Sequence, residues 1–275
     1  MVNQPRHQMD TGGGQTGAYN PNATDILAEG MRIPPIRLFE KGKMRRDIFD
    51  FVLANVRFPG SQRGDLWSMI GSARVGERRL MGLMDMWSAK TIEDFLADLY
   101  EYTEFLMRAE IRKIPEGTYY GKALSDGKPG AGQPVTIRCR TTIKDGTITI
   151  GYRDTDPMID YYMNSTLANT YSSVFIALMT SVGRPIKYRS EVVMRPVEVK
   201  TKPGTLAHAT PPAPVGLCTL YEAKQLIEAV WDSLAKVAPE KAREIYGVVM
   251  DPETFEVNEA ATQELRAEMK KQNPG

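Results

Sequence analysis

The chain has 275 residues, 42% hydrophobic and 25% charged, so it can bury a substantial core and is typical of a globular protein. Its 35 Lys and Arg residues nearly balance 34 Asp and Glu residues, which gives no reason to expect a nucleic acid or an acidic membrane as partner. No apolar run approaches the roughly 20 residues of a membrane span, and the start lacks the apolar stretch of a signal peptide. Only two cysteines occur, Cys139 and Cys218, far apart in sequence, so we expect a reducing compartment and a cytoplasmic location.

The N-terminal residues 1–43 are irregular and rich in Gly and Pro, with too little apolar content to become ordered without tertiary contacts or a partner. Within them His7 lies three residues before Asp10, and three glycines follow, at Gly12, Gly13 and Gly14. An imidazole and a carboxylate at this spacing can bind a divalent metal or relay a proton, and consecutive glycines let backbone approach a ligand closely. On these residues alone, a surface His–Asp pair in a flexible terminus is the favoured interpretation.

From residue 44 to residue 113, apolar residues recur at helical spacing. They predict three helices: one that Pro59-Gly60 ends, a second over about 62–88, and a third to about 113 that a capping box at Thr91 begins. Met and aromatic side chains on a helical face are far more often core than cofactor contacts. We therefore expect the three helices to pack as a helical layer.

The apolar period then changes to two. Three segments alternate apolar and polar residues, at 118–124, 135–143 and 147–152, and they predict antiparallel strands. Asp145-Gly146 separates the last two, and this dipeptide supplies the positive φ angles of a type I′ hairpin turn. A further short strand is expected at 195–199.

Two long amphipathic helices are predicted in the C-terminal half. The first is capped by Ser165 or Thr166 and stops at Gly183, and the second starts at Thr219, with Glu222 completing a capping box. The predicted fold class is therefore α+β, with a helical layer over about 44–113, then antiparallel strands and these two helices. We divide the chain into a site segment (1–43), an α+β domain (44–250) and a polar tail or docking helix (251–275).

Several longer motifs resemble the hydantoinase B/oxoprolinase family, which also supplies the large subunits of acetone and acetophenone carboxylases. They are His7-x-x-Asp10-x-Gly12-Gly13, Asn22-x-Thr24-Asp25-Ile26, Glu29-Gly30-x-x-Ile33-Pro34-Pro35, Asn55-Val56-Arg57 and Arg74-Val75-Gly76-Glu77-Arg78-Arg79. The resemblance runs from about His7 to Gly247 and implies a partial copy of the hydantoinase B fold. Family members usually carry a further N-terminal half with a Thr-His-Leu-Pro-Asp-like motif and more chain after the position of Gly247.

The resemblance also implies a divided site. In the metal-containing carboxylases, the His and Asp of that further motif join the histidine that matches His7 in holding a manganese-type divalent ion. His7 would then be a metal ligand, Asp10 a metal ligand or a residue that orients it, and Gly12 to Gly14 the loop that approaches the bound group. No nucleotide-phosphate motif occurs in this chain, so ATP would bind to another subunit. The resemblance implies that this subunit is a hydantoinase A-like partner.

Three positions depart from the family pattern. Asp154-Thr155-Asp156 stands at a Gly-Thr-Ser type turn, the Gly-Pro before Asn164 is absent, and His208 falls where asparagine is common. A lone histidine such as His208 can act as general base, although a hydrogen-bonded loop histidine is the more frequent occupant of such a position. His208 is the one candidate for a catalytic residue that the sequence offers.

We expect the chain to be a subunit of an ATP-dependent ketone carboxylase of the acetone or acetophenone type, a hetero-oligomer that uses a ketone and bicarbonate. The divided architecture and the departures at 154–156 and His208 favour a carboxylase. Two alternatives stay open: a subunit of a hydrolase that opens hydantoins, oxoproline or lactams, and a non-catalytic subunit that stabilises such a complex.

Overall fold

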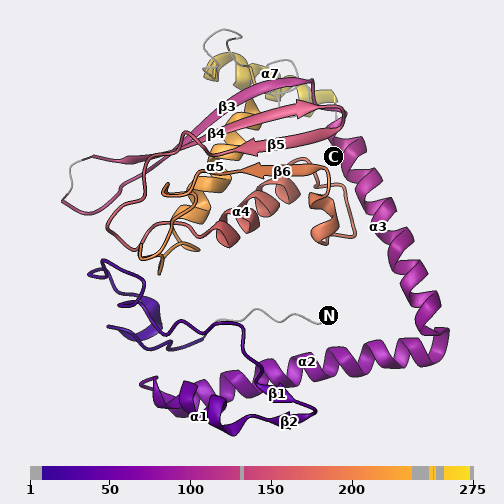
Figure 1. Cartoon of the computed structure of the whole chain (residues 1–275). Coiled ribbons are helices and arrows are strands. Elements are labelled where there is room, and N and C mark those ends of the chain that lie inside the picture. Colours follow the sequence, from indigo (N-terminus) through magenta and orange to yellow (C-terminus); the bar gives the residue numbers. More distant parts are fainter. Residues whose placement is uncertain (1–7, 131–132, 237–247, 250, 252–256, 273–275) are drawn as a thin grey trace.

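The computed structural model describes residues 8–130, 133–236, 248–249, 251 and 257–272. A four-stranded sheet backed by helices lies at one end of the molecule, and a long helical arm extends from it (Figure 1). This arrangement confirms the predicted α+β class. None of the described helices is both long and apolar enough to cross a membrane.

The sheet contains β3 (Gly117–Ser125), β4 (Val135–Lys144), β5 (Thr147–Gly151) and β6 (Val197–Lys200), in that order. The first three pair antiparallel, and Asp145 and Gly146, at φ 50° and 68°, form the predicted turn between β4 and β5. β6 pairs parallel to β5, because the chain crosses back through a helix before entering it. The sheet is therefore mixed.

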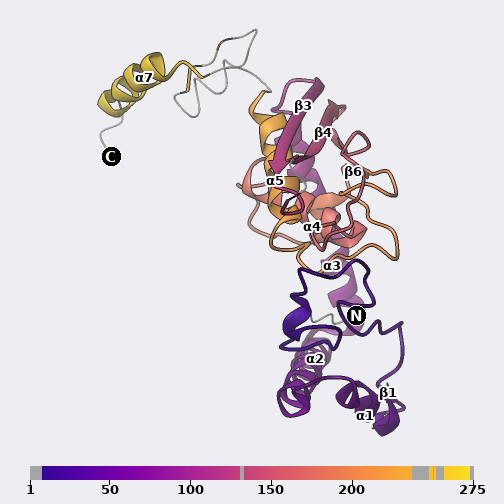
Figure 2. The same cartoon turned by 90° about the vertical axis from the view of Figure 1, so that its left-hand side faces the viewer.

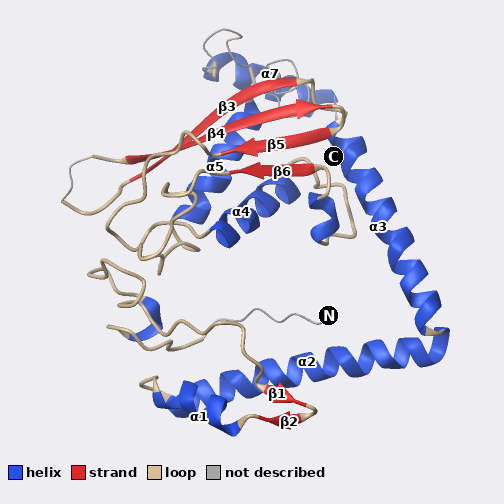
Figure 3. Ribbon diagram, in the orientation of Figure 1, coloured by secondary structure: helices blue, strands red, loops and turns tan. Residues whose placement is uncertain are grey.

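Two helices cover one face of the sheet, α4 (Leu167–Thr180) and α5 (Glu222–Ala235), as Figure 3 shows. They are the two predicted amphipathic helices. Alternate residues of the central strands point toward them and are almost fully buried with the apolar side chains of both helices: Ile137, Ile143, Ile148, Ile150, Val174, Leu178, Leu226 and Val230. The opposite face of the sheet keeps charged and polar side chains.

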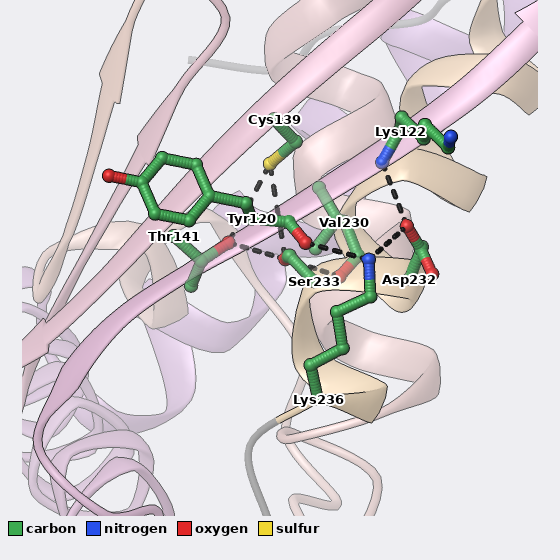
Figure 4. A network of polar contacts seen from close by, with 8 residues as sticks. All are labelled: Tyr120, Lys122, Cys139, Thr141, Val230, Asp232, Ser233 and Lys236. Carbon is green, nitrogen blue, oxygen red and sulfur yellow. Dashed lines mark hydrogen bonds and ion pairs between the residues drawn. The ribbon is translucent and has the colours of Figure 1, made fainter. Parts of the chain in front are cut away.

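The contact between α5 and the edge strand β3 is unusually close. A Cβ atom on Gly121 would lie 2.1 Å from the Ala229 carbonyl oxygen, so only glycine fits there. Beside it, Asp232 accepts a 2.8 Å hydrogen bond from the Lys122 N–H, and Lys236 donates to the Tyr120 carbonyl at 2.9 Å (Figure 4). These side chains pair backbone groups that an edge strand leaves free.

The helical arm consists of α1 (Arg46–Ala54), α2 (Pro59–Trp87) and α3 (Ala89–Ile111). Pro59 does not end a helix as predicted; it is the first residue of α2, where its fixed φ and missing N–H are favourable. The cap of α3 is Ser88, whose hydroxyl accepts from the Thr91 N–H at 3.2 Å, and not Thr91 itself. The helices thus occupy the predicted segment with shifted ends.

The arm leaves many apolar side chains in contact with solvent. α2 and α3 meet at a corner, and the far end of α3 reaches the sheet domain (Figure 1). Gln62 is the one buried residue among those of α2, whereas Met86, Trp87 and Phe95 are 70%, 59% and 62% exposed. The helices therefore do not cover one another as a packed layer would, and the predicted core face of α2 is largely uncovered in this chain.

Short elements complete the fold. The segment before the arm contains a 3-10 helix at Thr16–Ala18 and a small hairpin of β1 (Phe39–Glu40) and β2 (Lys43–Met44). A second 3-10 helix, Glu191–Met194, contacts α3. The polar helix α7 (Glu259–Gln272) lies apart from the sheet (Figure 2).

We predict that Gly121→Ala destabilises the protein by about 1–3 kcal/mol, because α5 must move away from β3 to admit a methyl group. Gly71→Ala is the matched control: nothing lies within 4 Å of its Cβ position on α2, so the better helix former should add about 0.5–1 kcal/mol. Urea unfolding followed by circular dichroism measures both changes. Equal stability of Gly121→Ala and the wild type would contradict the close packing.

Candidate functional site

The motif-bearing N-terminal residues lie against two loops at one end of the sheet domain (Figures 1 and 2). We call this region the junction: it comprises residues 8–31, 157–165 and 203–218. Ile26 donates a 2.8 Å hydrogen bond to the Pro212 carbonyl, and the rings of Tyr19 and Tyr162 meet edge to face at 5.7 Å. The junction brings together motifs that are nearly 200 positions apart in the sequence.

The glycine loop is packed against the chain itself. The Gly14 N–H donates to the Ala28 carbonyl at 2.7 Å, and the Met31 N–H donates to the Thr11 carbonyl at 2.8 Å. Gly12 and Gly13 have φ angles of 80° and 76°, which disfavour any side chain. A Cβ on Gly13 would also lie 2.5 Å from the Glu29 backbone. Local packing therefore requires these glycines, whether or not they also contact a ligand.

Asp10 is fully buried and holds the start of this loop. Its carboxylate accepts from the backbone N–H of Arg57 at 2.5 Å, from the Arg57 guanidinium at 3.2 Å and from the Gly12 N–H at 3.2 Å. The same guanidinium reaches the carbonyl of Gly13. Arg57 follows α1, so this ion pair ties the glycine loop to the base of the arm. Because the carboxylate of Asp10 is enclosed while the Arg57 side chain is partly exposed, loss of the guanidinium would leave a buried charge with fewer partners.

Glu29 ties the same segment to the sheet domain. Its side chain is buried, and its two oxygens each accept a 2.7 Å hydrogen bond, from the N–H groups of Val215 and Gly216. Burial raises the pKa of the Glu29 carboxyl, and the two N–H donors oppose that shift without cancelling it. The sequence marked Glu29 only as part of a motif; its partners, 186 and 187 residues away, gave no local signal.

Asn164 fixes the second loop of the junction. Its amide oxygen accepts from the Ile159 N–H at 2.8 Å, and its nitrogen, with two N–H donors, lies 2.8–2.9 Å from the carbonyl oxygens of Ile159, Tyr161 and Pro214. The residue is fully buried, so these contacts satisfy an amide that would otherwise be costly to enclose. The one family-like position in this stretch is thus a structural anchor.

His208 lies in the same loop region and is partly buried. Its Nδ1 atom is 2.8 Å from the Thr201 hydroxyl, and its backbone bonds to Gly204 and Thr205 within the turn. The hydrogen-bonded loop histidine that the sequence suggested is therefore present. Its use as a general base stays a prediction.

The predicted metal ligands are only partly within the described structure. His7 lies outside the described residues, so its side chain cannot be placed against Asp10. Asp10 itself already binds a guanidinium and two backbone N–H groups. Within the described ranges no group of three His, Cys, Asp or Glu side chains could hold a metal ion. The donor set described here does not form a metal centre by itself.

The sequence analysis did not predict that the carboxyl group of Glu222 is buried. The sequence predicted that it would complete a capping box with Thr219, but the N-cap residue is Tyr221 and Glu222 is the first residue of α5. Its side chain turns inward, where the Ser125 hydroxyl lies 3.4 Å from Oε1, and Oε2 has no hydrogen-bond partner among the residues that the structure describes. Burial raises the pKa of Glu222 to about 7.

We predict that Glu29→Gln destabilises the protein by about 1–3 kcal/mol, because an amide nitrogen would face one of two buried N–H donors. Amide exchange at Val215 and Gly216, followed by mass spectrometry, should become faster. Glu40→Gln is the control, since Glu40 is an exposed carboxylate. Unchanged protection at both amides would show that Glu29 does not hold this loop.

We also predict a pH-dependent effect of Glu222→Gln. The folded-state pKa of about 7 lies above the ordinary value of 4.5, so this group's stabilising effect is complete below pH 4.5 and is lost as pH rises to about 7. The loss amounts to roughly 3 kcal/mol at most. Glu222→Gln should remove this pH dependence, so its stability relative to wild type should increase from pH 4.5 to pH 8. Glu228→Gln, exposed on the same helix, should show no such trend.

Comparison with known proteins shows the family to which the motifs of the junction belong. A family model described as hydantoinase B/oxoprolinase matches residues 1–270. The chain is 35% identical over 243 residues to caprolactamase subunit beta from Pseudomonas jessenii, an alignment that covers 88% of this chain and 41% of that protein. The chain therefore spans about two fifths of the length of this relative.

Two further similarities bear on function. The crystal structure of an ATP-dependent caprolactamase from Pseudomonas jessenii superposes with a TM-score of 0.76 at 33% identity, covering 84% of this chain and 40% of that one. The delta subunit of acetophenone carboxylase from Aromatoleum aromaticum is 27% identical over 139 residues, which are 50% of this chain and 20% of that subunit.

Proposed function

The chain belongs to the hydantoinase B/oxoprolinase family, and from this we propose that it is part of a multi-subunit, ATP-dependent enzyme that opens cyclic amides. The observation that carries the proposal is the similarity to caprolactamase subunit beta over 88% of this chain, together with a matching fold. The sequence alone led us to expect a ketone carboxylase. Its motifs are shared by hydrolases and carboxylases, so the choice of a hydrolase rests on the comparison with caprolactamase.

In this proposal the junction is the part of the active site that this chain contributes. Asp10 and Arg57 fix the glycine loop, Glu29 holds residues 215 and 216 against it, and Asn164 holds the neighbouring loop. A rigid support of this kind orients reacting groups without supplying them. His208 is the candidate for proton transfer, because a second ring nitrogen is left when Nδ1 bonds to Thr201.

Ketone carboxylation is the second candidate function. It is favoured by the similarity to acetophenone carboxylase delta subunit, although this similarity covers half of the chain at a lower identity. The substrates would then be a ketone and bicarbonate. The departures at 154–156 and His208 do not separate the two reactions, since the structure gives Asp156 a structural role: it pairs with Arg138 and accepts from the Thr136 N–H.

We further propose that other polypeptides complete the site. ATP would bind to a hydantoinase A-like partner, and His7 would share a manganese-type divalent ion with ligands from another polypeptide. The exposed apolar side chains of α2 and α3 support a hetero-oligomer, because a surface of this kind is typical of protein contacts.

The test is an assay of the chain purified with the polypeptides that assemble with it. We expect ATP-dependent formation of the ring-opened acid: an amino acid from caprolactam or 5-oxoproline, or an N-carbamoyl amino acid from a hydantoin. Incorporation of labelled bicarbonate into acetone or acetophenone, without ring opening, would instead establish the carboxylase. If an intact, metal-loaded assembly catalyses neither reaction, both proposals are contradicted. The remaining interpretation is then that the chain is a non-catalytic structural subunit.

Two variants in that assembly test the residue roles. His208→Ala should lower kcat at least tenfold and change its pH profile if the ring transfers a proton, whereas Lys202→Ala, exposed in the same loop, should not. His7→Ala should remove bound metal measured by elemental analysis. Unchanged metal content would reject the ligand assignment.

A further inference from the structure

The outer face of the sheet carries a depression that none of the junction residues lines. It is bordered by Arg140, Thr149, Gly151, Arg153, Asp154 and Lys200. A second depression joins it, since both are lined by Arg140 and Asp154, and it adds Tyr120, Lys122 and Lys236 to the lining. We call the two adjoining depressions the groove: its first part lies on the outer face of the sheet, and its second part reaches Lys236, the C-cap residue of α5, beside the edge strand β3.

Strand register explains why Arg140, Gly151 and Lys200 line the first depression together. Arg140 pairs with Gly151, and Gly151 pairs with Lys200, so the three occupy one row across β4, β5 and β6. Side chains in such a row share a face of the sheet. Because Gly151 has no side chain, an open position remains between a guanidinium and an ammonium group. Arg153 lies two residues after the end of β5 and adds a second guanidinium to the lining.

The charges of the groove are not balanced within the described part of the chain. Lys200 pairs with Glu198 at 2.8 Å, Lys236 pairs with Asp232 at 2.9 Å, and Arg138 pairs with Asp156. Arg140, Arg153 and Lys122 make no side-chain ion pair or hydrogen bond among the described residues, although Arg153 lies near enough to Glu198 to help Lys200 lower the pKa of that carboxyl. Asp154 is the one acid in the lining. An excess of about two positive charges is left.

We propose that this groove binds a phosphate group, with Arg140 and Arg153 as its principal ligands above Gly151. A phosphate monoester carries a charge of about −1.5 to −2 at neutral pH, which matches the excess. Guanidinium groups bind such oxyanions through two parallel N–H donors. The Thr149 hydroxyl, which donates to Glu198 at 3.3 Å, lies in the same lining. This inference does not depend on the proposed reaction.

The probes are inorganic phosphate and pyrophosphate, titrated into the full-length chain by isothermal calorimetry at constant ionic strength. We expect saturable binding, weakened at least tenfold by Arg140→Gln or Arg153→Gln. Gly151→Val is the sharpest variant, because it fills the open position and leaves every charge in place; it should abolish binding. Lys144→Gln, exposed at the far end of β4, removes a charge outside the groove and should change affinity less than twofold.

Three outcomes would overturn the proposal. The first is an absence of saturable binding, and the second is phosphate binding that Gly151→Val leaves unchanged. The third is acetate binding as tight as phosphate binding, since the groove would then select carboxylates. Circular dichroism of each variant identifies loss of fold, and the glutamine variants of the exposed arginines keep the test valid if Gly151→Val unfolds. Neither probe requires turnover, so a negative result here leaves the proposed enzyme function untouched.

Discussion

The constraint on which the molecule depends is the enclosure of Glu29 between two parts of the chain. A carboxylate removed from water needs donors for both oxygens, and the backbone of Val215 and Gly216 supplies them at 2.7 Å. The N-terminal segment has few apolar groups, so packing alone cannot hold it. Each charge-assisted hydrogen bond contributes about 1.5–3 kcal/mol, which is comparable to the cost of ordering one or two residues. Several such contacts are therefore needed, and Asp10 with Arg57 supplies the next.

This view changes how the three glycines should be understood. A run of glycine in a polar segment suggests close approach to a ligand, and that was our expectation from the sequence. In the structure the nearest obstacles are protein: Asn55 beside Gly12, residues 28 to 30 beside Gly13, and the Asn20 side chain beside Gly14. The glycines allow two stretches of backbone to pair within a segment that has no regular strand. A ligand would approach a surface that this pairing has already fixed.

The sequence predicted best where neighbouring residues decide the structure. The turn at Asp145-Gly146, the alternation along β4 and the apolar face of α4 depend on residues a few positions apart, and all three are present. Predictions were wrong where a signal had two physical meanings. Proline both stops and starts helices, and an acidic residue near a helix start either caps it, as expected of Glu222, or turns into the core.

The site was less predictable because its contacts join distant residues. Nothing near Glu29 in the sequence indicates Val215, and Arg57 is an ordinary basic residue until Asp10 lies against it. The apolar face of α2 illustrates the opposite problem. Its pattern is that of a helix with a covered face, yet the described chain leaves that face exposed. The pattern marks the face as apolar but does not say whether the same chain covers it.

The described acidic groups of the junction are largely committed to structure. Asp10 binds Arg57, Glu29 binds two amides, and Asp25 accepts from the N–H groups of Leu27 and Ala28 at 2.9 and 3.0 Å. A carboxylate whose oxygens already accept hydrogen bonds from the protein would have to give up those contacts before it could take a proton from a substrate. The described junction therefore supplies rigid loops that can position a reacting group, and one histidine, His208, in one of these loops. If another polypeptide supplies the reacting groups, these loops are already ordered when it binds, as a divided active site requires.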